Sequence, residues 1–342
     1  LQQWLNEKVF PIEAKLTQDD IYYFSKLAIL EYLTSGITTN FDMYLNPEAI
    51  IKASLDMKYR TVLCGAVNDF CLSVEDVERC FKEYNQENSL ISYILGFSHE
   101  YTNSKEKIQQ VAALSHKYKA PVFTHLSETE YEVSTCKEKT GLSPAEYLCD
   151  LGVYDYGGGA FHCVHMSEHD LDLFQEKHLN IVTNPASNLK LASGIAPIQA
   201  MLQRNINVCL GTDGAASNNC LDMFREMFLV TGLAKYKNCD ASAVDAYEVL
   251  KMATISGAKA LNLNCGVLEA GKLADLIILD LHQPNMQPMN NIAKNIVYSG
   301  SKSNVKCTMV NGEILYEDGQ FHVGFDIASL YDEIQKRVER LK

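Results

Sequence analysis

Five titratable residues come at points where apolar runs of the sequence end. His125 closes the run VFTH, Glu128 follows three residues later, and His162 comes directly after GAF. Asp213 lies in LGTDGAASNN, behind the apolar run NVCL, and His99 follows LGFS. Imidazoles and carboxylates are the groups that most often transfer protons in enzymes. What matters is therefore whether the fold brings these side chains to one place.

Short apolar runs alternate with longer helical patterns along most of the chain. This alternation is typical of β-α units and predicts an α/β protein with a parallel sheet. Runs such as VFTH and NVCLG are apolar throughout, as expected for strands that are covered on both faces. Seven runs are candidate strands: ITTNFDMY, RTVLCGAV, LISYILGF, APVFTHLS, GAFHCVHM, NIVTNPAS and NVCLGTDG. A closed (β/α) barrel needs eight strands, so the runs fall one short.

The titratable residues all come at the carboxyl ends of these runs. In a barrel of parallel strands, those ends meet at the one rim where such folds carry out their chemistry. His125, His162 and Asp213 would end the fifth, sixth and eighth strands if one strand is missing in front. The sequence therefore predicts that they share a site.

Each of these residues also has an ordinary structural interpretation. GTDG is a common turn, because the Asp side chain bonds nearby backbone amides. The spacing His125-x-x-Glu128 arises by chance in a chain with nine histidines and many glutamates. His162 and His165 can be half-buried histidines without a role, and we keep that interpretation for His165. Only the joint pattern favours chemistry.

Composition excludes several classes of partner. The chain has 342 residues and a formal net charge of -13, which disfavours DNA, RNA and anionic membranes as partners. No apolar run approaches the ~18 residues of a membrane span. The eleven cysteines include no C-x-x-C pair, which indicates reduced thiols and a cytoplasmic protein. A homo-oligomer is expected only from its general frequency.

Longer segments resemble the amidohydrolase superfamily. The resemblance covers essentially the whole chain, and its nearest branch is the 5'-methylthioadenosine/S-adenosylhomocysteine deaminases, with triazine hydrolases and guanine deaminases as neighbours. The segments that carry it are FTHLSETE, FHCVHMSEHDL, NPASNLKLASGIAPI, LGTDGAASNNCLDMFREM, GKLADLIILDL and VNGEILYEDG.

The resemblance implies a TIM-like (β/α)8 barrel of the metal-dependent hydrolase type. We expect the catalytic barrel in residues 1–264, with its first strand absent. Strands of a partial small β-sandwich domain are expected in residues 265–324. The amphipathic residues 325–342 are expected to form a helix that packs back on the rest of the chain.

The resemblance also implies a divalent metal, zinc before Fe²⁺ or Mn²⁺, held by His125 and Asp213. Relatives add two histidines of an H-x-H motif on the first strand, and this sequence contains no H-x-H. We therefore expect a chain truncated at its N-terminus. One His and one Asp would hold a metal weakly, because tight sites use three or four protein ligands. Whether the chain as given is active stays open.

The implied reaction is the hydrolytic deamination of a cyclic amidine, and three residues are expected to be catalytic. A metal would activate water near neutral pH. Glu128 would then shuttle a proton to the ring nitrogen, while Asp213 accepts the proton of the water. His162 would stabilise the oxygen and the developing tetrahedral centre, and with Glu128 it would also contact the substrate.

Two further substrate contacts follow from the resemblance. Glu13, in FPIE, would bind the ribose 2'- and 3'-hydroxyls, although by itself it would be taken for an exposed glutamate at a helix start. His99, in GFSHEYT, would contact the purine nucleoside. Relatives that bind S-adenosylhomocysteine often place an arginine near Gly65, but here the only arginine of that strand is Arg60, at its start. We therefore expect 5'-methylthioadenosine, 5'-deoxyadenosine or adenosine to be better substrates than S-adenosylhomocysteine.

Two alternatives remain. The chain could act on another heterocycle, as guanine deaminases and triazine hydrolases do. It could also be a non-catalytic subunit or binding module on a degenerate barrel. Glu128 and His162 favour the enzyme, because a binding module has no use for a proton shuttle beside a metal position.

Overall fold

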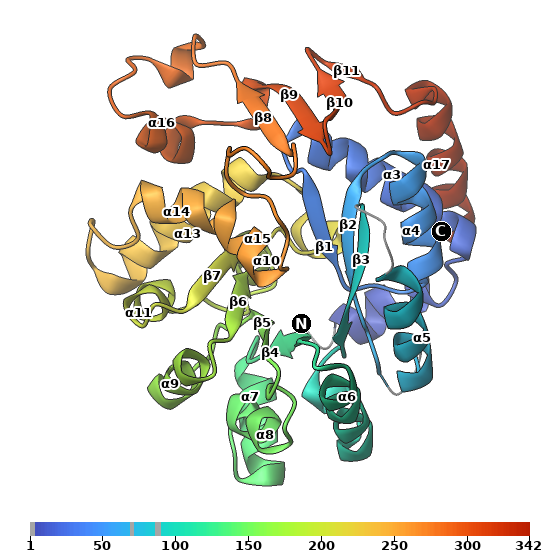
Figure 1. Ribbon diagram of the computed structural model, residues 1–342, viewed down its shortest axis with the longest axis vertical. Coiled ribbons are helices and arrows are strands. Elements are labelled where there is room, and N and C mark those ends of the chain that lie inside the picture. The colour runs from blue at the N-terminus through green and yellow to red at the C-terminus, as the bar shows by residue number, and fades with distance from the viewer. Residues whose placement is uncertain (1–3, 69–71, 86–89) are drawn as a thin grey trace.

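The computed structural model describes residues 4–68, 72–85 and 90–342. Its main sheet has seven strands, which pair in sequence order and all run parallel. Figure 1 shows these strands as an arc with the helices on its outside. The strands are β1 (Thr39–Asp42), β2 (Arg60–Cys64), β3 (Ile91–Gly96), β4 (Val122–Leu126), β5 (Gly158–His162), β6 (Asn180–Thr183) and β7 (Asn207–Leu210). All seven predicted strands, and the α/β class, are confirmed.

Helices connect successive strands, and side-chain caps start many of them. Thr17 caps the first long helix, α3 (Gln18–Thr34), in a capping box with Asp20. The other principal helices are α4 (Pro47–Asp56), α5 (Val74–Tyr84), α6 (Lys105–Tyr118), α7 (Glu130–Thr140), α8 (Pro144–Asp150), α9 (Glu168–Glu176), α11 (Ile198–Gln203), α13 (Met223–Asn238) and α14 (Ala246–Met252). Shorter helices are α2 (Phe10–Glu13), α10 (Pro185–Lys190), α12 (Ala215–Asn218) and α15 (Ile255–Ala260).

Two apolar layers bury the sheet. The larger core lies between the strands and the helices, as the unbroken apolar runs require. A smaller cluster includes Cys64, Phe123 and Phe161 on neighbouring strands. Close packing of β4 and β5 depends on Gly158, which has φ +122° and whose Cβ would lie 1.9 Å from the Val122 carbonyl oxygen. These contacts fix the register of the strands that carry His125 and His162.

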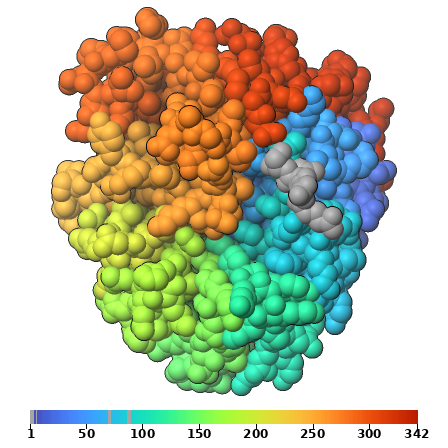
Figure 2. Space-filling view, viewed as in Figure 1, coloured from blue at the N-terminus to red at the C-terminus, as the bar shows by residue number. Residues whose placement is uncertain are grey.

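A second sheet is antiparallel and lies beside the barrel strands, at the top of Figure 1. It consists of β8 (Leu276–Leu279), β9 (Val305–Val310), β10 (Glu313–Glu317) and β11 (Gln320–Phe321), with α16 (Ile292–Ser299) between β8 and β9. In space-filling form the same face shows these orange and red segments above the green and yellow ones (Figure 2). The division of the chain into domains after residues 264 and 324 stays a prediction.

The last helix, α17 (Ile327–Leu341), packs against α3. Arg337 and Arg340 both donate to the fully buried carboxylate of Asp20. Burial raises the pKa of Asp20, but the hydrogen bonds from Arg340, Thr17 and Arg337 outweigh it and leave that pKa below its usual range. The C-terminal helix is therefore attached by charge as well as by its apolar face.

Two findings bear on the environment of the protein. In the part of the chain that the structure describes, no helix is both long enough and apolar enough to cross a membrane. The cysteines within those residues are free thiols, most of them buried. Cys71 lies outside the described residues. The cytoplasmic location and the oligomeric state stay predictions.

A buried ion pair joins the main sheet to the small sheet. Arg60, at the start of β2, donates from Nε to Asp275 Oδ2 at 2.7 Å and from Nη2 to Oδ1 at 3.0 Å. The two side chains are 1% and 2% exposed, and Asp275 also accepts from the backbone amide of Asn311. An exposed pair, Lys58 with Glu313, links the same two parts of the chain at 59% and 54% exposure.

This geometry predicts very different costs for breaking the two pairs. The substitution Arg60→Met leaves the Asp275 charge buried and unpaired, and we expect it to lower the free energy of unfolding by about 3–5 kcal/mol. Lys58→Met breaks only the exposed pair and should cost about 0–1 kcal/mol. Denaturant titration of both variants measures the difference, and equal losses would contradict a structural role for the buried pair.

Candidate active site

Three histidine rings stack at the carboxyl ends of β3, β4 and β5. The rings of His99 and His125 have centroids 4.3 Å apart and an interplanar angle of 19°. Those of His125 and His162 lie 5.4 Å apart at 22°. Strand pairing sets this arrangement, because Leu126, next to His125, is in register with His162. The pairing of the strands therefore brings the three histidines to one edge of the sheet, as expected from the sequence.

Each imidazole is anchored through Nδ1. His125 Nδ1 bonds the backbone oxygen of Ser98 at 2.9 Å, and His99 Nδ1 bonds the hydroxyl of Ser98 at 2.8 Å. His162 Nδ1 bonds the amide oxygen of Asn188 at 2.8 Å. The carbonyl and amide oxygens require an N–H donor, so they fix the tautomers of His125 and His162 and leave Nε2 to face a ligand. The hydroxyl partner of His99 fixes its ring orientation only.

Two carboxylates complete the group. Glu128 is 4% exposed, and its Oε1 accepts from the hydroxyl of Ser193 at 3.0 Å and lies 4.0 Å from His162 Nδ1. Asp213 follows β7 on the same edge, where Oδ2 accepts from Ser187 at 2.5 Å and Oδ1 accepts from the Gly214 amide at 2.7 Å. Both carboxylates influence the charge on His162.

Burial and neighbouring charges shift the pKa values of the three imidazoles in different directions. Burial, together with the neighbouring imidazoles, lowers the pKa of His99 well below its usual range, and burial also lowers the pKa of His125. Burial acts in the same direction on His162, but Glu128, Asp213 and the bond to Asn188 outweigh it and raise the pKa of that ring. His125 is therefore a neutral imidazole near neutral pH, and His162 is the ring that can carry a proton.

Backbone strain is concentrated in the same place. Ser127, His162 and Asp213 adopt left-handed conformations, with φ of +50°, +67° and +61°. Non-glycine residues pay on the order of 1–3 kcal/mol for such conformations. Strain of this kind persists only where the surrounding contacts impose it, which is common at functional sites.

Glu13 is the last residue of the short helix α2. It is half-buried, and its Oε1 accepts a hydrogen bond from the Tyr44 hydroxyl at 2.7 Å, just after β1. The interpretation of Glu13 as a solvent-exposed residue at a helix start is therefore wrong. His165, kept as a structural histidine, is half-buried and bonds the Ser193 backbone oxygen through Nε2.

Sequence reasoning missed the residues that hold these side chains. Asn188 and Ser187 lie in NPASN, and Ser193 lies in LASG, so the motif was noted but its residues received no role. Asp42, the last residue of β1, was also missed, and burial raises its pKa to about 6. Its position at a strand end was the available signal.

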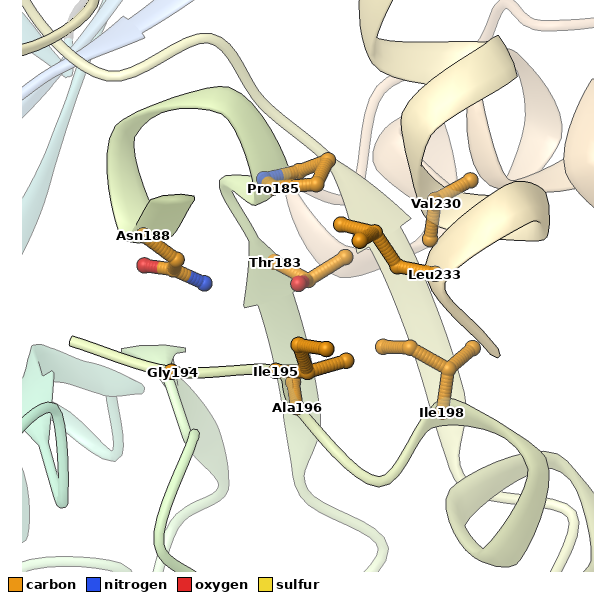
Figure 3. Close-up of a pocket in the computed structure, with 9 residues that line it drawn as sticks. All are labelled: Thr183, Pro185, Asn188, Gly194, Ile195, Ala196, Ile198, Val230 and Leu233. Atoms are coloured by element: carbon orange, nitrogen blue, oxygen red, sulfur yellow. The ribbon is translucent and has the colours of Figure 1, made fainter. Parts of the chain in front are cut away.

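The pocket in Figure 3 lies behind Asn188 and is not the place for a substrate. It offers about 10 Å³, which is room for about one water molecule. Its lining is mostly apolar, from β6, the segment 194–198 and α13, with Val230 and Leu233 on the α13 side. None of the histidines of the stack lines it.

An arc of parallel strands whose carboxyl ends gather imidazoles and carboxylates defines a (β/α)-barrel enzyme. The chain belongs to the amidohydrolase family, whose sequence profile matches residues 1–315. This confirms the resemblance noted in the sequence.

Relatives that carry names support this family assignment. The chain is 37% identical to the 5-methylthioadenosine/S-adenosylhomocysteine deaminase of Caldanaerobacter subterraneus, covering 100% of this chain and 81% of that protein. It is also 37% identical to the 5'-deoxyadenosine deaminase of Methanothermobacter thermautotrophicus, over 94% of this chain and 77% of the relative.

The fold matches solved deaminases and hydrolases. An adenosine deaminase from Xanthomonas campestris with bound zinc superimposes with a TM-score of 0.94 at 29% identity, over 99% of this chain and 80% of that one. A zinc-containing atrazine chlorohydrolase from Arthrobacter aurescens matches at a TM-score of 0.86 and 22% identity, over 98% and 79% of the two chains, which speaks for the fold alone.

The types of side chain at this site are suitable ligands for a divalent metal. A neutral imidazole oriented through Nδ1, as in His125, and a carboxylate, as in Asp213, are ordinary zinc ligands. Within residues 4–68, 72–85 and 90–342, however, no three His, Cys, Asp or Glu side chains are grouped closely enough to hold a metal. His125 and Asp213, the ligands expected from the sequence, would by themselves be fewer than the three or more protein ligands that such sites use.

Glu226, on α13, ties together the loops that carry the anchors. It is fully buried and accepts from the Ala186 amide at 3.0 Å and from Asn218 Nδ2 at 2.7 Å. Ala186 lies in the first turn of the helix that holds Ser187 and Asn188, and Asn218 closes the loop of Asp213 through a bond to the Thr212 backbone oxygen. Burial raises the pKa of Glu226 to about 7, although the hydrogen bonds from Ala186 and Asn218 lower that pKa.

This pKa predicts how stability depends on pH. A carboxyl group whose folded-state pKa is raised contributes stability that is fully present below its unfolded pKa and is lost as pH rises through about 7. Glu226→Gln removes this titration, so the free energy of unfolding of the wild type should fall relative to the variant between about pH 4 and pH 7. The exposed Glu176→Gln should run parallel to the wild type, and an identical slope for Glu226→Gln would refute the assignment. Denaturant titration at several pH values measures both.

Proposed function

We propose that the chain is a metal-dependent hydrolytic deaminase of adenosine-type nucleosides, which forms the inosine analogue and ammonia. The observation that carries this proposal is the buried contact between Glu128 and His162 at the edge that also holds His125 and Asp213. Relatives at 37% identity are named as deaminases of such nucleosides.

The reaction replaces the amino group at C6 of the purine by oxygen. Water adds to C6, and a proton must reach the ring nitrogen beside it before ammonia can leave. Glu128 suits this transfer, because a carboxylate can accept a proton and then donate it. The hydroxyl of Ser193 holds Oε1 of Glu128 at 3.0 Å and so fixes the direction of the transfer.

His162 suits the stabilisation of charge on the added oxygen. Its raised pKa makes a protonated ring available next to Glu128, and Asn188 fixes the ring plane. A preoriented donor stabilises developing negative charge without reorganisation. Asp213, oriented by Ser187, would take up the proton that the attacking water releases.

His125 and Asp213 would hold the metal, with zinc the first choice and Fe²⁺ or Mn²⁺ as alternatives. When bound, such a metal supplies Lewis-acid activation of water near neutral pH. The crystal structures of the adenosine deaminase and the atrazine chlorohydrolase both contain zinc.

Substrate recognition is proposed to rest on Glu13 and His99. Glu13, held by Tyr44, can accept hydrogen bonds from two ribose hydroxyls, which suits a carboxylate with two oxygens. His99 stacks on His125, and as a neutral ring it can contact the purine. Arg60 is bonded to Asp275 and lies at the opposite end of β2, so it does not pair with a ligand carboxylate. We therefore favour 5'-methylthioadenosine, 5'-deoxyadenosine and adenosine over S-adenosylhomocysteine.

Glu128→Gln tests the proton shuttle. The amide cannot carry a proton to the ring nitrogen, so we expect kcat to fall by about 10²–10⁴-fold for the best nucleoside while KM changes little. Release of ammonia from zinc-loaded protein gives the rate, and the neighbouring exposed Glu130→Gln is the matched control. Assays of guanine and a chlorotriazine run beside the adenosine derivatives. Preference for either of these, or no turnover at all, would overturn the proposed function.

Glu13→Gln tests recognition of the ribose. The wild type should prefer adenosine to 2'-deoxyadenosine, and the variant should lose most of this preference, because an amide accepts one hydroxyl less well than a carboxylate accepts two. We expect a change of about tenfold in the ratio of kcat/KM for the two substrates, since a hydrogen bond to a charged group contributes about 1.5–3 kcal/mol. An unchanged ratio would remove Glu13 from the binding site.

A further inference from the structure

Two buried carboxyl groups lie behind Glu128 and take no part in the proposed reaction. Glu132, 1% exposed, is in the first turn of α7. Glu100, 6% exposed, begins the short helical turn Glu100–Thr102 that follows His99. Side chains of this kind are almost never buried without a partner, so their contacts need an explanation.

Glu132 clamps the turn that carries Glu128. Its Oε1 accepts from the backbone amide of Ser127, and its Oε2 accepts from the backbone amide of Glu128 at 2.8 Å. Ser127 has φ +50°, so the clamp holds a residue in a strained conformation. Thr129 caps the same helix through the Glu132 amide, which fixes the start of α7 relative to the turn.

The buried carboxyl groups of Glu100 and Glu132 lie close enough to interact, and the charge on Glu132 adds to burial in raising the pKa of Glu100. Two carboxylates cannot bond each other unless one of them carries a proton. Both oxygens of Glu132 already accept from backbone amides, so in a pair that shares a proton the donor would be Glu100. Oε2 of Glu100 is buried and has no hydrogen-bond partner within the described residues. Burial raises the pKa of Glu100 to about 9 and that of Glu132 to about 7, which agrees with this order.

Other titratable groups surround Glu100 and Glu132 on the elements that pack against them. Those that act electrostatically on one or both carboxyls, or are acted on by them, are Glu128, Tyr101, Cys136, Tyr147, Tyr154, His162 and Cys163. His162 is the one base among them that can become a cation. An excess of negative charge in this region favours retention of one proton by the pair.

We propose that Glu132 is a positioning residue that presents Glu128 to the substrate, and that a protonated Glu100 holds Glu132 in place. The proposal rests on the proposed function, because it gives Glu128 the proton transfer. Neither residue touches the reacting atoms. The pair links the loop after β3 to the loop after β4, so it also fixes Glu128 relative to His99.

The proposal predicts unequal effects of two isosteric substitutions. Glu132→Gln turns one acceptor into a donor that faces a backbone amide, so the turn shifts and kcat should fall about 10–100-fold with little change in KM. Glu100→Gln keeps a donor toward Glu132 and should retain activity within about twofold. Equal losses in the two variants, or the reverse order, would overturn the assignment of the proton.

Infrared spectroscopy tests the proton without any turnover. At about pH 8 the wild type should show the carbonyl stretch of a protonated carboxylic acid, because Glu100 titrates near 9 while Glu132 and Glu226 titrate near 7. The band should vanish in Glu100→Gln and remain in Glu128→Gln. Its persistence in Glu100→Gln would contradict the shared proton.

Amide hydrogen exchange tests whether Glu132 holds the turn, and this measurement also needs no turnover. The amides of Ser127 and Glu128 should exchange faster in Glu132→Gln but not in Glu100→Gln, with matched thermal melts to exclude general unfolding. Unchanged exchange in Glu132→Gln would refute the clamp. If wild-type protein turns over no nucleoside, the proposed function fails, whereas these two spectroscopic results still decide the structural part of the inference.

Discussion

The catalytic edge depends on one constraint, which is that several ionisable side chains share a region with little water. Each must be neutral, paired or protonated, because an isolated buried charge is costly. His99 and His125 meet the constraint as neutral rings, and His162 meets it through the carboxylates of Glu128 and Asp213. The proton states of the site are therefore set jointly, and changing one carboxyl group changes the charge preferred by its neighbours.

A second layer of polar residues makes this arrangement rigid. Ser98 anchors two of the histidines, and Asn188 anchors the third. Asn188 is itself held by its place on a short helix in which the Ala186 amide donates to Glu226. The left-handed conformations of His162 and Asp213 exist only because these contacts outweigh their cost. Pre-organisation of this kind is what electrostatic stabilisation of a transition state requires.

The sequence predicted the strands and the shared edge, but not the contacts within it. Apolar runs such as VFTH indicate buried parallel strands, and parallel strands place their carboxyl ends together, so the meeting of His125 and His162 follows from pattern alone. Asn188 lies 26 residues from His162, and Asp275 lies 215 residues from Arg60. Such pairs depend on the paths of loops and on the packing of two sheets, which periodicity does not encode. The substrate-binding role of Glu13 was inferred from resemblance to a family. Nothing in the sequence around Glu13 indicates its hydrogen bond to Tyr44.

The choice among nucleosides is decided by the 5' substituent, because the purine and the ribose are common to all of them. Glu128, His162 and His99 would act on the purine, and Glu13 on the ribose, so none of them distinguishes these substrates. Relatives with the same 37% identity carry different substrate names, which means that overall similarity does not distinguish them either. An S-adenosylhomocysteine carboxylate needs a cation that is free to pair with it, and Arg60 is bonded to Asp275 through Nε and Nη2. Removing that arginine from Asp275 would expose a buried charge at the opposite end of the strand. The folding role of Arg60 therefore works against its recruitment for a ligand, which supports the proposed preference for uncharged 5' substituents.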